Sequence, residues 1–284
     1  MEKLDVVYIL RNSGTRWGNN EIRHSVRSLE NHLEFGKLWI VGNLPKFFDK
    51  SRINFVEAND CYSNKIKNAI FKISTVCKED RLSENFILMN DDFFFLKKKG
   101  GIEYFNKGKL KATMKNHETK GGYYYKAIKN TVAILRDMGI NDPVDFEMHY
   151  PIVFNKIKFI EMVNGIDERE VYLFRSVYGN LNIIKSKYRK DVKIFNVKQF
   201  KKKNKIDFMS TDDKVVMSPM VQKWIVGRFG SRSTFEKKPK KGYFCNRPIV
   251  FGGASYNAGD IIIGDIPEKV VKENGMKRIN RDFY

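Results

Sequence analysis

The chain has 284 residues, of which 42% are hydrophobic and 13% aromatic, so it can bury a substantial core. This composition excludes a disordered chain, and no apolar run is long enough to cross a bilayer. The net charge of +20 favours a polyanionic partner: nucleic acid, an anionic glycan or a membrane surface. The alternative is a lysine-rich sequence whose charges are simply solvated.

The first 90 residues predict a parallel α/β sheet. Short apolar runs predict buried strands, and apolar residues at helical spacing predict helices. In chain order these are a strand at Asp5–Leu10, a helix at Asn20–Leu33, strands at Lys37–Val41 and Ile53–Glu57, a helix at Ser63–Val76 and a strand at Asn85–Asn90. Strands that alternate with helices in this way are typical of α/β domains.

The middle of the chain is mixed, and the C-terminal part changes character. We predict helices at Lys126–Met138, Ile157–Val163, Asp167–Tyr178 and Met220–Phe229, strands at Ile183–Ile184 and Val192–Phe195, and a basic loop at Phe200–Lys205. A basic linker, Lys237–Lys241, then leads to a β-rich stretch with glycine turns and a short helix at Pro267–Asn274. We therefore predict two domains, residues 1–236 and 243–284, the second too small to be very stable alone.

The cysteines and the N-terminus indicate the compartment. Cys61, Cys77 and Cys245 form no CxxC pair, which favours free buried thiols in a reducing compartment over a zinc site. The first residues run directly into a strand, with no signal-peptide pattern. We therefore expect a cytoplasmic protein.

Asn90-Asp91-Asp92 follows a buried strand and precedes three phenylalanines. Two adjacent carboxylates in such a place are unfavourable unless something neutralises them. A divalent cation, Mn²⁺ or Mg²⁺, would do so, and it binds one or two carboxylates, water and substrate phosphates. The alternative is an ordinary turn. We predict that Asp91 and Asp92 are metal ligands and that Asn90 contributes to cofactor binding.

Other polar residues stand where a nucleotide is expected. In parallel sheets ligands bind beyond the carboxyl ends of the strands, and Arg11 and Asn12 follow the first strand. Arg23 and Arg27 lie four residues apart on one helix, where they repel each other, so we predict that they lie near the phosphates. Asn20 and Glu21 are explained more simply as the start of that helix.

A third cluster is Asp145-Phe146-Glu147-Met148-His149. In an extended segment Asp145, Glu147 and His149 would share one face, where they could supply a general base or a further metal ligand. We predict all three as catalytic candidates, against the alternative of a structural histidine. The basic runs Lys97–Lys99, Lys201–Lys205 and Lys237–Lys241 could steer an acceptor or be solvated loops.

Several segments together resemble a known family. They are Asp5–Tyr8, Asn20–Leu29, Leu38–Val41, Ser63-Asn64 and Phe86–Phe94. Their order and spacing are similar to the Stealth-type sugar-phosphate transferases and, more broadly, to GT-A glycosyltransferases, whose DxD motif holds a metal and a nucleotide sugar. His149-Tyr150-Pro151 is similar to a later His-x-Pro of the Stealth family. The early acidic residue of that family is missing here, since Ile9–Gly14 stands in its place.

The resemblance implies a GT-A-like fold and a metal-dependent glycosyltransferase that moves a sugar from a nucleotide-sugar donor to a hydroxyl acceptor. One alternative is Stealth-like transfer of a sugar phosphate to a polysaccharide, and another is a non-catalytic nucleic-acid-binding protein. The C-terminal module resembles small β domains of bacteriophage proteins. A phage-encoded enzyme would act in the host cytoplasm, with modified DNA or an anionic glycan as the polyanionic acceptor.

Overall fold

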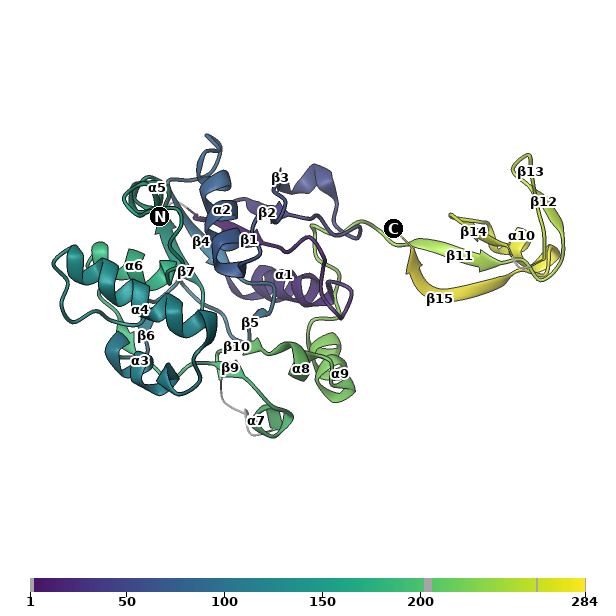
Figure 1. The fold of residues 1–284 in the computed structure, drawn as a ribbon. Helices are drawn as coiled ribbons and strands as arrows, with labels where there is room; N and C mark the ends of the chain where they lie inside the picture. Colours follow the sequence, from purple (N-terminus) through teal and green to yellow (C-terminus); the bar gives the residue numbers. More distant parts are fainter. Residues whose placement is uncertain (1–2, 202–205, 259, 284) are drawn as a thin grey trace. The chain divides into compact units, whose positions relative to one another are not determined.

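The computed structural model describes residues 3–201, 206–258 and 260–283 (Figure 1). Its central sheet has the strand order β3-β2-β1-β4-β7. The strands are β1 Asp5–Ile9, β2 Leu38–Gly42, β3 Asn54–Glu57, β4 Asn85–Met89 and β7 Ile152–Asn155. Three of its four pairings are parallel, and β7 runs antiparallel to β4. The predicted α/β fold with a mostly parallel sheet is therefore confirmed.

Side chains alternate between the two faces of this sheet, and helices cover both. Val7, Trp39 and Leu88 are lateral neighbours in the register, and they pack in one core with residues of α2 (Lys65–Cys77), α5 (Lys156–Asn164) and α6 (Phe174–Leu181). The next residue along β1, Tyr8, points the other way and hydrogen bonds through its hydroxyl to Ser25 Oγ at 2.8 Å. Ser25 belongs to α1 (Asn20–His32), so α1 covers the opposite face.

A second, smaller sheet has the order β5-β10-β9 and follows the first directly. Its strands are β5 Phe93–Phe95, β9 Lys193–Ile194 and β10 Phe208–Thr211. Two serines of α1 hold β5 in place: Ser25 Oγ donates to the Phe93 carbonyl, and Ser28 Oγ accepts from the Phe95 amide at 3.1 Å. The three phenylalanines are fully buried between α1 and β10.

The remaining elements between residues 3 and 233 are short strands and peripheral helices. They are η1 Lys50–Arg52, β6 Phe105–Asn106, α3 Leu110–Glu118, α4 Gly122–Asp137, β8 Lys187–Tyr188, α7 Val197–Lys201, α8 Asp213–Val216 and α9 Pro219–Arg228. Among the described residues, no helix has the length and apolar character that a membrane span requires.

Most predicted helices and strands are present, and the errors are local. The helix predicted at Asp167–Tyr178 begins only at Phe174, because Asp167 Oδ1 accepts from the Arg169 amide at 2.9 Å and closes a turn instead. The strand predicted at Ile183–Ile184 is absent, since Ile183 has a left-handed φ of 50° after α6. The predicted loop Phe200–Lys205 begins inside α7, and its residues 202–205 lie outside the described part of the chain.

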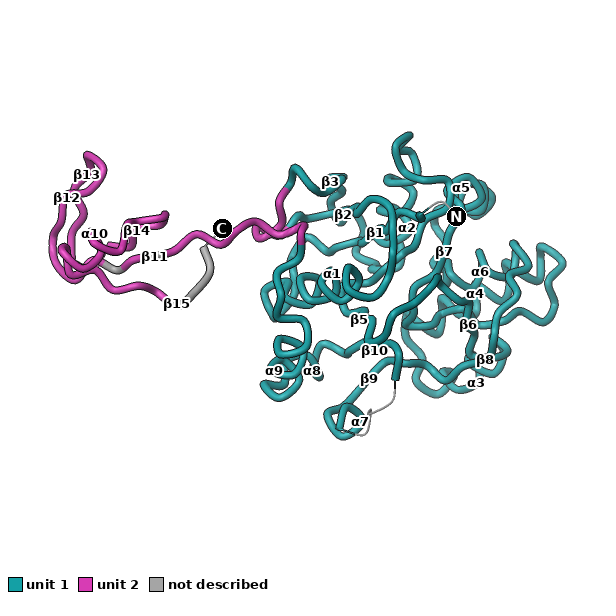
Figure 2. The backbone as a smooth tube through the Cα atoms, turned by 180° about the vertical axis from the view of Figure 1, so that it is seen from behind, with its two compact units in different colours: residues 1–44, 50–233 teal, residues 45–49, 234–284 magenta. Residues whose placement is uncertain are grey.

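The chain divides into two compact units, residues 1–44 with 50–233 and residues 45–49 with 234–284 (Figure 2). The predicted boundary at 236–243 did not include the segment 45–49. That segment joins the smaller unit through backbone hydrogen bonds from Asp49 to Phe235 at 2.8 Å and from Lys237 to Phe47 at 2.9 Å. The two segments are distant in sequence, so their pairing could not be read from local patterns.

The smaller unit is rich in β structure, as predicted. It contains β11 Lys240–Phe244, β12 Ile249–Phe251, β13 Ala254–Tyr256, β14 Ile261–Ile263, α10 Glu268–Glu273 and β15 Lys277–Phe283, arranged as a sheet β14-β11-β15 and a hairpin β12-β13. Its core is formed by Tyr243, Cys245, Ile249, Ile262, Ile266 and Met276. The predicted end of the linker Lys237–Lys241 is wrong, because Lys240 and Lys241 are the first two residues of β11.

The three cysteines are free, but they differ in exposure. Cys77 and Cys245 are buried, as expected, whereas Cys61 is exposed. Burial raises the pKa of the Cys77 thiol to about 12, so this cysteine stays protonated and unreactive at neutral pH.

Asp5 is a buried carboxylate on which the start of the sheet depends. Its Oδ1 accepts from the Lys37 amide at 2.7 Å, and its Oδ2 accepts from Trp39 Nε1 at 2.9 Å and from the Ser83 amide at 3.1 Å.

Asp5→Ala leaves these buried donors unsatisfied and is expected to lower the free energy of unfolding by about 3 kcal/mol. Urea denaturation measures this. Asp137→Ala, at a carboxylate that is 74% exposed, is the control and should leave stability unchanged.

Candidate functional site

A cavity of about 540 Å³ lies at the carboxyl ends of β1 and β4. Its size falls within the usual range of small-molecule sites. Five cationic side chains line it: Arg11, Lys65, Lys72, Arg175 and Lys193. Three carboxylates, Asp60, Asp91 and Glu147, and one imidazole, His149, line it as well. The cavity therefore combines groups that attract phosphate with groups that can bind a cation or accept a proton.

Asp91 lies in a turn that links the two sheets. The Phe93 amide donates to the Asn90 carbonyl at 3.3 Å, which closes the turn between β4 and β5. Burial raises the pKa of the Asp91 carboxyl well above its ordinary value, and the neighbouring charges of Asp92 and Glu21 raise it further. Asp91 is thus a carboxylate that lacks a sufficient counter-charge among the protein groups around it.

Asp92, by contrast, is well satisfied by its neighbours. Its Oδ2 accepts from Ser210 Oγ and from the Thr211 amide at 3.1 Å, both on β10, and it lies 3.5 Å from Lys193 Nζ. Asp92 does not line the cavity. The two predicted metal ligands therefore differ: Asp91 faces the cavity, and Asp92 fastens the turn to the second sheet.

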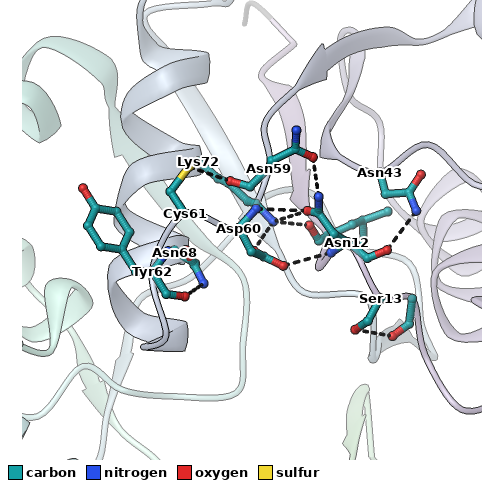
Figure 3. A network of polar contacts seen from close by, with 11 residues as sticks. Asn12, Ser13, Asn43, Asn59, Asp60, Cys61, Tyr62, Asn68 and Lys72 are labelled. Carbon is teal, nitrogen blue, oxygen red and sulfur yellow. Dashed lines mark hydrogen bonds and ion pairs between the residues drawn. The ribbon is translucent and has the colours of Figure 1, made fainter.

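A network of polar contacts (Figure 3) contains Lys72 and Asp60, which both line the cavity. The Lys72 ammonium is buried; it donates to the Leu10 carbonyl at 2.6 Å and forms an ion pair with Asp60 Oδ1 at 2.5 Å. Asn12 bridges the same groups, because its amide donates to Asp60 Oδ2 at 3.0 Å and its Nδ2 donates to Asn59 Oδ1. This network holds the end of β1 against the loop after β3.

Asn12, which was predicted to bind the cofactor, belongs to this network and does not itself line the cavity, whereas its neighbours Arg11 and Ser13 do. A glycine makes the close packing of this network feasible. A Cβ added to Gly42, which has φ of +115°, would lie 2.2 Å from the Leu10 carbonyl oxygen that receives Lys72. Gly42 therefore allows β2 to approach the end of β1.

The predicted cluster at residues 145–149 is only partly brought to the cavity. Asp145 is fully buried, accepts from Thr113 Oγ1 at 2.6 Å and lies outside the lining. Glu147 and His149 both line the cavity. Glu147 Oε1 also accepts from the Ser176 amide at 3.0 Å near the start of α6, and burial raises the pKa of this carboxyl.

Arg175 and Asn90 lie together at the floor of the cavity. The Arg175 guanidinium donates to the Tyr150 carbonyl at 2.7 Å and to Asn90 Oδ1 at 3.4 Å. Arg175 is only 5% exposed, so these contacts fix the direction of its side chain. Asn90 is thus placed at the cavity as predicted, with its side-chain oxygen oriented by a buried cation.

The two arginines predicted near the phosphates lie elsewhere. Arg27 is buried and donates to the carbonyls of Phe229 and Gly230 at 3.0 and 3.1 Å, so it anchors the end of α9. Arg23 is partly buried on α1 and is not among the residues that line the cavity. The arginines at the cavity are Arg11 and Arg175 instead.

Among the described residues of the larger unit, none of the basic runs lines the cavity. Lys97 and Lys98 are exposed, whereas Lys99 forms an ion pair with Asp207. In Lys201–Lys205 only Lys201 belongs to the described residues, and it ends α7.

Several charged residues of the site were not predicted from the sequence: Asp60, Lys65, Lys72, Arg175, Asp191 and Lys193. A signal existed for Lys72, since it lies between Ala69 and Val76 on the apolar side of its helix, where a lysine needs a partner. Arg175 lay inside a predicted helix among apolar residues. Asp191 is hydrogen bonded to the imidazole of His149, which lies 42 residues earlier in the chain. No local sequence pattern predicts that contact.

Comparison of the sequence with protein-family models and with curated proteins gives no match. Among solved structures, the chain is similar to the galactosyltransferase LgtC in complex with donor and acceptor sugar analogs, with 10% identity and a TM-score of 0.46 over 81% of this chain and 97% of that one. It is also similar to the glycosyltransferase GlyE of Streptococcus pneumoniae TIGR4, with 11% identity and a TM-score of 0.40 over 80% and 60% of the two chains. These likenesses are too distant to assign a function.

The uncompensated carboxylate of Asp91 should cost stability. Because folding raises the pKa of Asp91, the folded protein loses stability as pH rises from about 4, the unfolded value, toward the higher folded value. Asp91→Asn removes this loss. We expect the variant to be more stable than the wild type at pH 8, in chelator, by at least about 1 kcal/mol, the equivalent of one pKa unit. The advantage should vanish near pH 4.

Urea denaturation at the two pH values measures this difference. Asp92→Asn is the matched control: it weakens the contacts with Ser210, Thr211 and Lys193 and should destabilise at pH 8. A loss of stability in Asp91→Asn at pH 8 would show that Asp91 is compensated within the protein.

Proposed function

We propose that the chain is a nucleotide-sugar-dependent glycosyltransferase. The observation that carries the proposal is the cavity at the carboxyl ends of β1 and β4, which Asp91 lines together with Arg11, Lys193 and Arg175. This is the edge at which parallel α/β sheets bind nucleotides. A nucleoside diphosphate needs cationic groups for its phosphates, and the residues that line the cavity supply them.

The elements that line the cavity differ in chemistry, which suggests an orientation for the donor. From α2 come apolar Ile66 and Ala69, together with Lys72, whose ammonium is already paired with Asp60, so we assign the nucleoside to this part of the lining. Asp91, Glu147 and His149 supply the acidic and basic groups, which suit the sugar and the bond that breaks. Arg11 acts electrostatically on both Asp60 and Asp91, so we assign it to the diphosphate.

The residues fit a divalent cation held largely by its substrate. No group of three His, Cys, Asp or Glu side chains forms a ready metal site within the described residues. Mg²⁺ and Mn²⁺ do not require one, since one or two carboxylates with water and phosphate oxygens suffice. Asp91 would hold the cation, and Asp92 Oδ1, which has no hydrogen bond within the described structure, could join it. The bound cation would neutralise charge on the leaving diphosphate.

The reaction also needs a group that accepts the proton of the attacking hydroxyl. His149 and Glu147 both line the cavity, whereas Asp145 is buried outside its lining, so we assign the role to one of the first two. Glu147 Oε1 is already engaged by Ser176. His149 is therefore the better candidate base, and Arg175 holds the floor of the site.

Sugar-phosphate transfer remains the alternative reaction at the same site. In glycosyl transfer the acceptor oxygen attacks the anomeric carbon, and the donor leaves as a nucleoside diphosphate. In sugar-phosphate transfer the oxygen attacks phosphorus, and a nucleoside monophosphate leaves. The same cavity and cation serve both, so the released nucleotide distinguishes them.

Incubation with a panel of nucleotide sugars and Mn²⁺, with the released nucleotide identified by mass, tests the function. We expect a nucleoside diphosphate from at least one donor, with water as acceptor if no other is present. Asp91→Ala should lower this rate by about 10²-fold or more, because the cation loses its main protein ligand. Asp137→Ala is the surface control and should leave the rate unchanged.

A second measurement separates binding from turnover. With the donor present, Mn²⁺ should raise the melting temperature of the wild type but not that of Asp91→Ala, since a ligand stabilises only the state that binds it. Release of a nucleoside monophosphate would replace the proposal by sugar-phosphate transfer. Absence of both turnover and Mn²⁺-dependent donor binding would refute a nucleotide-sugar site.

A further inference from the structure

His149 is held by a partly buried carboxylate, Asp191, that the sequence did not reveal. Its Nδ1 lies 2.7 Å from Asp191 Oδ2, and its backbone amide donates to Asp191 Oδ1 at 3.2 Å. The Lys193 amide donates to the same Oδ1 at 3.3 Å. The side chains of His149 and Asp191 are 32% and 19% exposed. Asp191 is thus fixed by two backbone amides and directs its second oxygen at the imidazole.

The charge state of Asp191 decides which ring nitrogen of His149 carries the proton. Burial opposes ionisation of Asp191, but the hydrogen bond and charge of His149 outweigh it and lower the pKa of the carboxyl to about 2. An ionised carboxylate only accepts hydrogen bonds, so Nδ1 must be the donor. In the neutral imidazole Nε2 then carries a lone pair, and this nitrogen has no hydrogen bond within the described structure.

We propose that Asp191 is a positioning residue that fixes the Nδ1–H tautomer of His149, so that Nε2 accepts the proton of the acceptor hydroxyl. The inference rests on the proposed glycosyltransferase. The hydroxyl oxygen forms a bond to the anomeric carbon, the bond from that carbon to the diphosphate breaks, and the diphosphate leaves with its electron pair. The proton passes to Nε2, and the ionised Asp191 stabilises the resulting imidazolium.

Lys193 connects this pair with the rest of the site. Its backbone amide binds Asp191, and its side chain lies 3.5 Å from Asp92. The turn that carries Asp91 and the carboxylate that orients His149 are therefore joined through one residue of β9. These contacts fix the position of His149 relative to Asp91, the carboxylate that lines the donor cavity.

Asp191→Asn tests the inference because it changes the tautomer and keeps the shape. The asparagine oxygen can still accept from the two backbone amides, and its NH₂ group then faces Nδ1. The NH₂ group donates a hydrogen bond, so Nδ1 must accept it and cannot carry a proton. The proton therefore moves to Nε2, which can then no longer act as the base. We expect kcat to fall by about 10²–10⁴-fold, with the affinity for the donor unchanged.

The tautomer itself is visible in the ¹⁵N NMR spectrum of the imidazoles, recorded at pH 8.5 so that histidine is neutral. The chain has four histidines, and His149→Gln assigns the signal of interest. The wild type should show His149 protonated on Nδ1, and Asp191→Asn should show it protonated on Nε2. The double variant His149→Gln/Asp191→Asn should have a kcat no lower than that of His149→Gln alone. Asp191 acts only through His149, so its replacement has no further effect once the imidazole is gone.

Asp207→Asn is the matched control. Asp207 is also a partly buried carboxylate with a pKa lowered to about 2, in this case by Arg189 and Lys99 against the effect of burial, but it does not line the cavity. Its variant should keep kcat. An Nε2–H tautomer in the wild type, or full activity in Asp191→Asn, would overturn the inference. Since the NMR measurement needs no turnover, it decides the tautomer even if the proposed function fails.

Discussion

The carboxylate of Asp92 is the contact on which the geometry of the cavity depends. It joins the turn after β4 to β10 through Ser210 and Thr211, and it reaches β9 through Lys193. Ser25 also links the two sheets, through Tyr8 of β1 and the Phe93 carbonyl of β5, but Asp92 is the side chain that attaches the turn itself to β10. Because Asp92 is used in this way, its neighbour Asp91 is left facing the cavity. One residue of the Asp-Asp pair is structural so that the other can be available to a ligand.

The buried charges of the larger unit fall into two groups. Asp5, Lys72 and Asp191 have several close partners, and the pKa of Asp191 is lowered accordingly. Asp91 and Glu147 have raised pKa values because burial and like charges are not compensated. Uncompensated charges are a cost in stability that proteins retain mainly at functional sites. Asp91 and Glu147 line the cavity, whereas Glu21, a third buried carboxylate with a raised pKa, does not.

The helix that carries the most recognisable motif serves mainly to assemble the fold. Ser25 and Ser28 bind the backbone of β5, and Arg27 binds the carbonyls that follow α9. The motif therefore secures the second sheet, and with it the position of the Asp91 turn, without contacting the cavity. This explains why two arginines four residues apart, which repel each other on an isolated helix, need not mark a phosphate site. Each finds its own partner once the chain has folded.

Local sequence patterns were sufficient to predict the central sheet and the edge of that sheet at which the cavity lies. Buried strands such as Asp5–Ile9 and Asn85–Met89 are continuous apolar runs, and the residues that follow a parallel strand must lie at its carboxyl edge, so Arg11, Asn90 and Asp91 could be placed near one another from the sequence. The tertiary structure alone decided which of these side chains face inward. The ion pair of Lys72 with Asp60, the attachment of Asp92 to β10 and the bond of Asp191 to His149 join segments 12 to 118 residues apart. Such contacts depend on how the sheets and loops pack, and the periodicity of a sequence describes only neighbours along the chain.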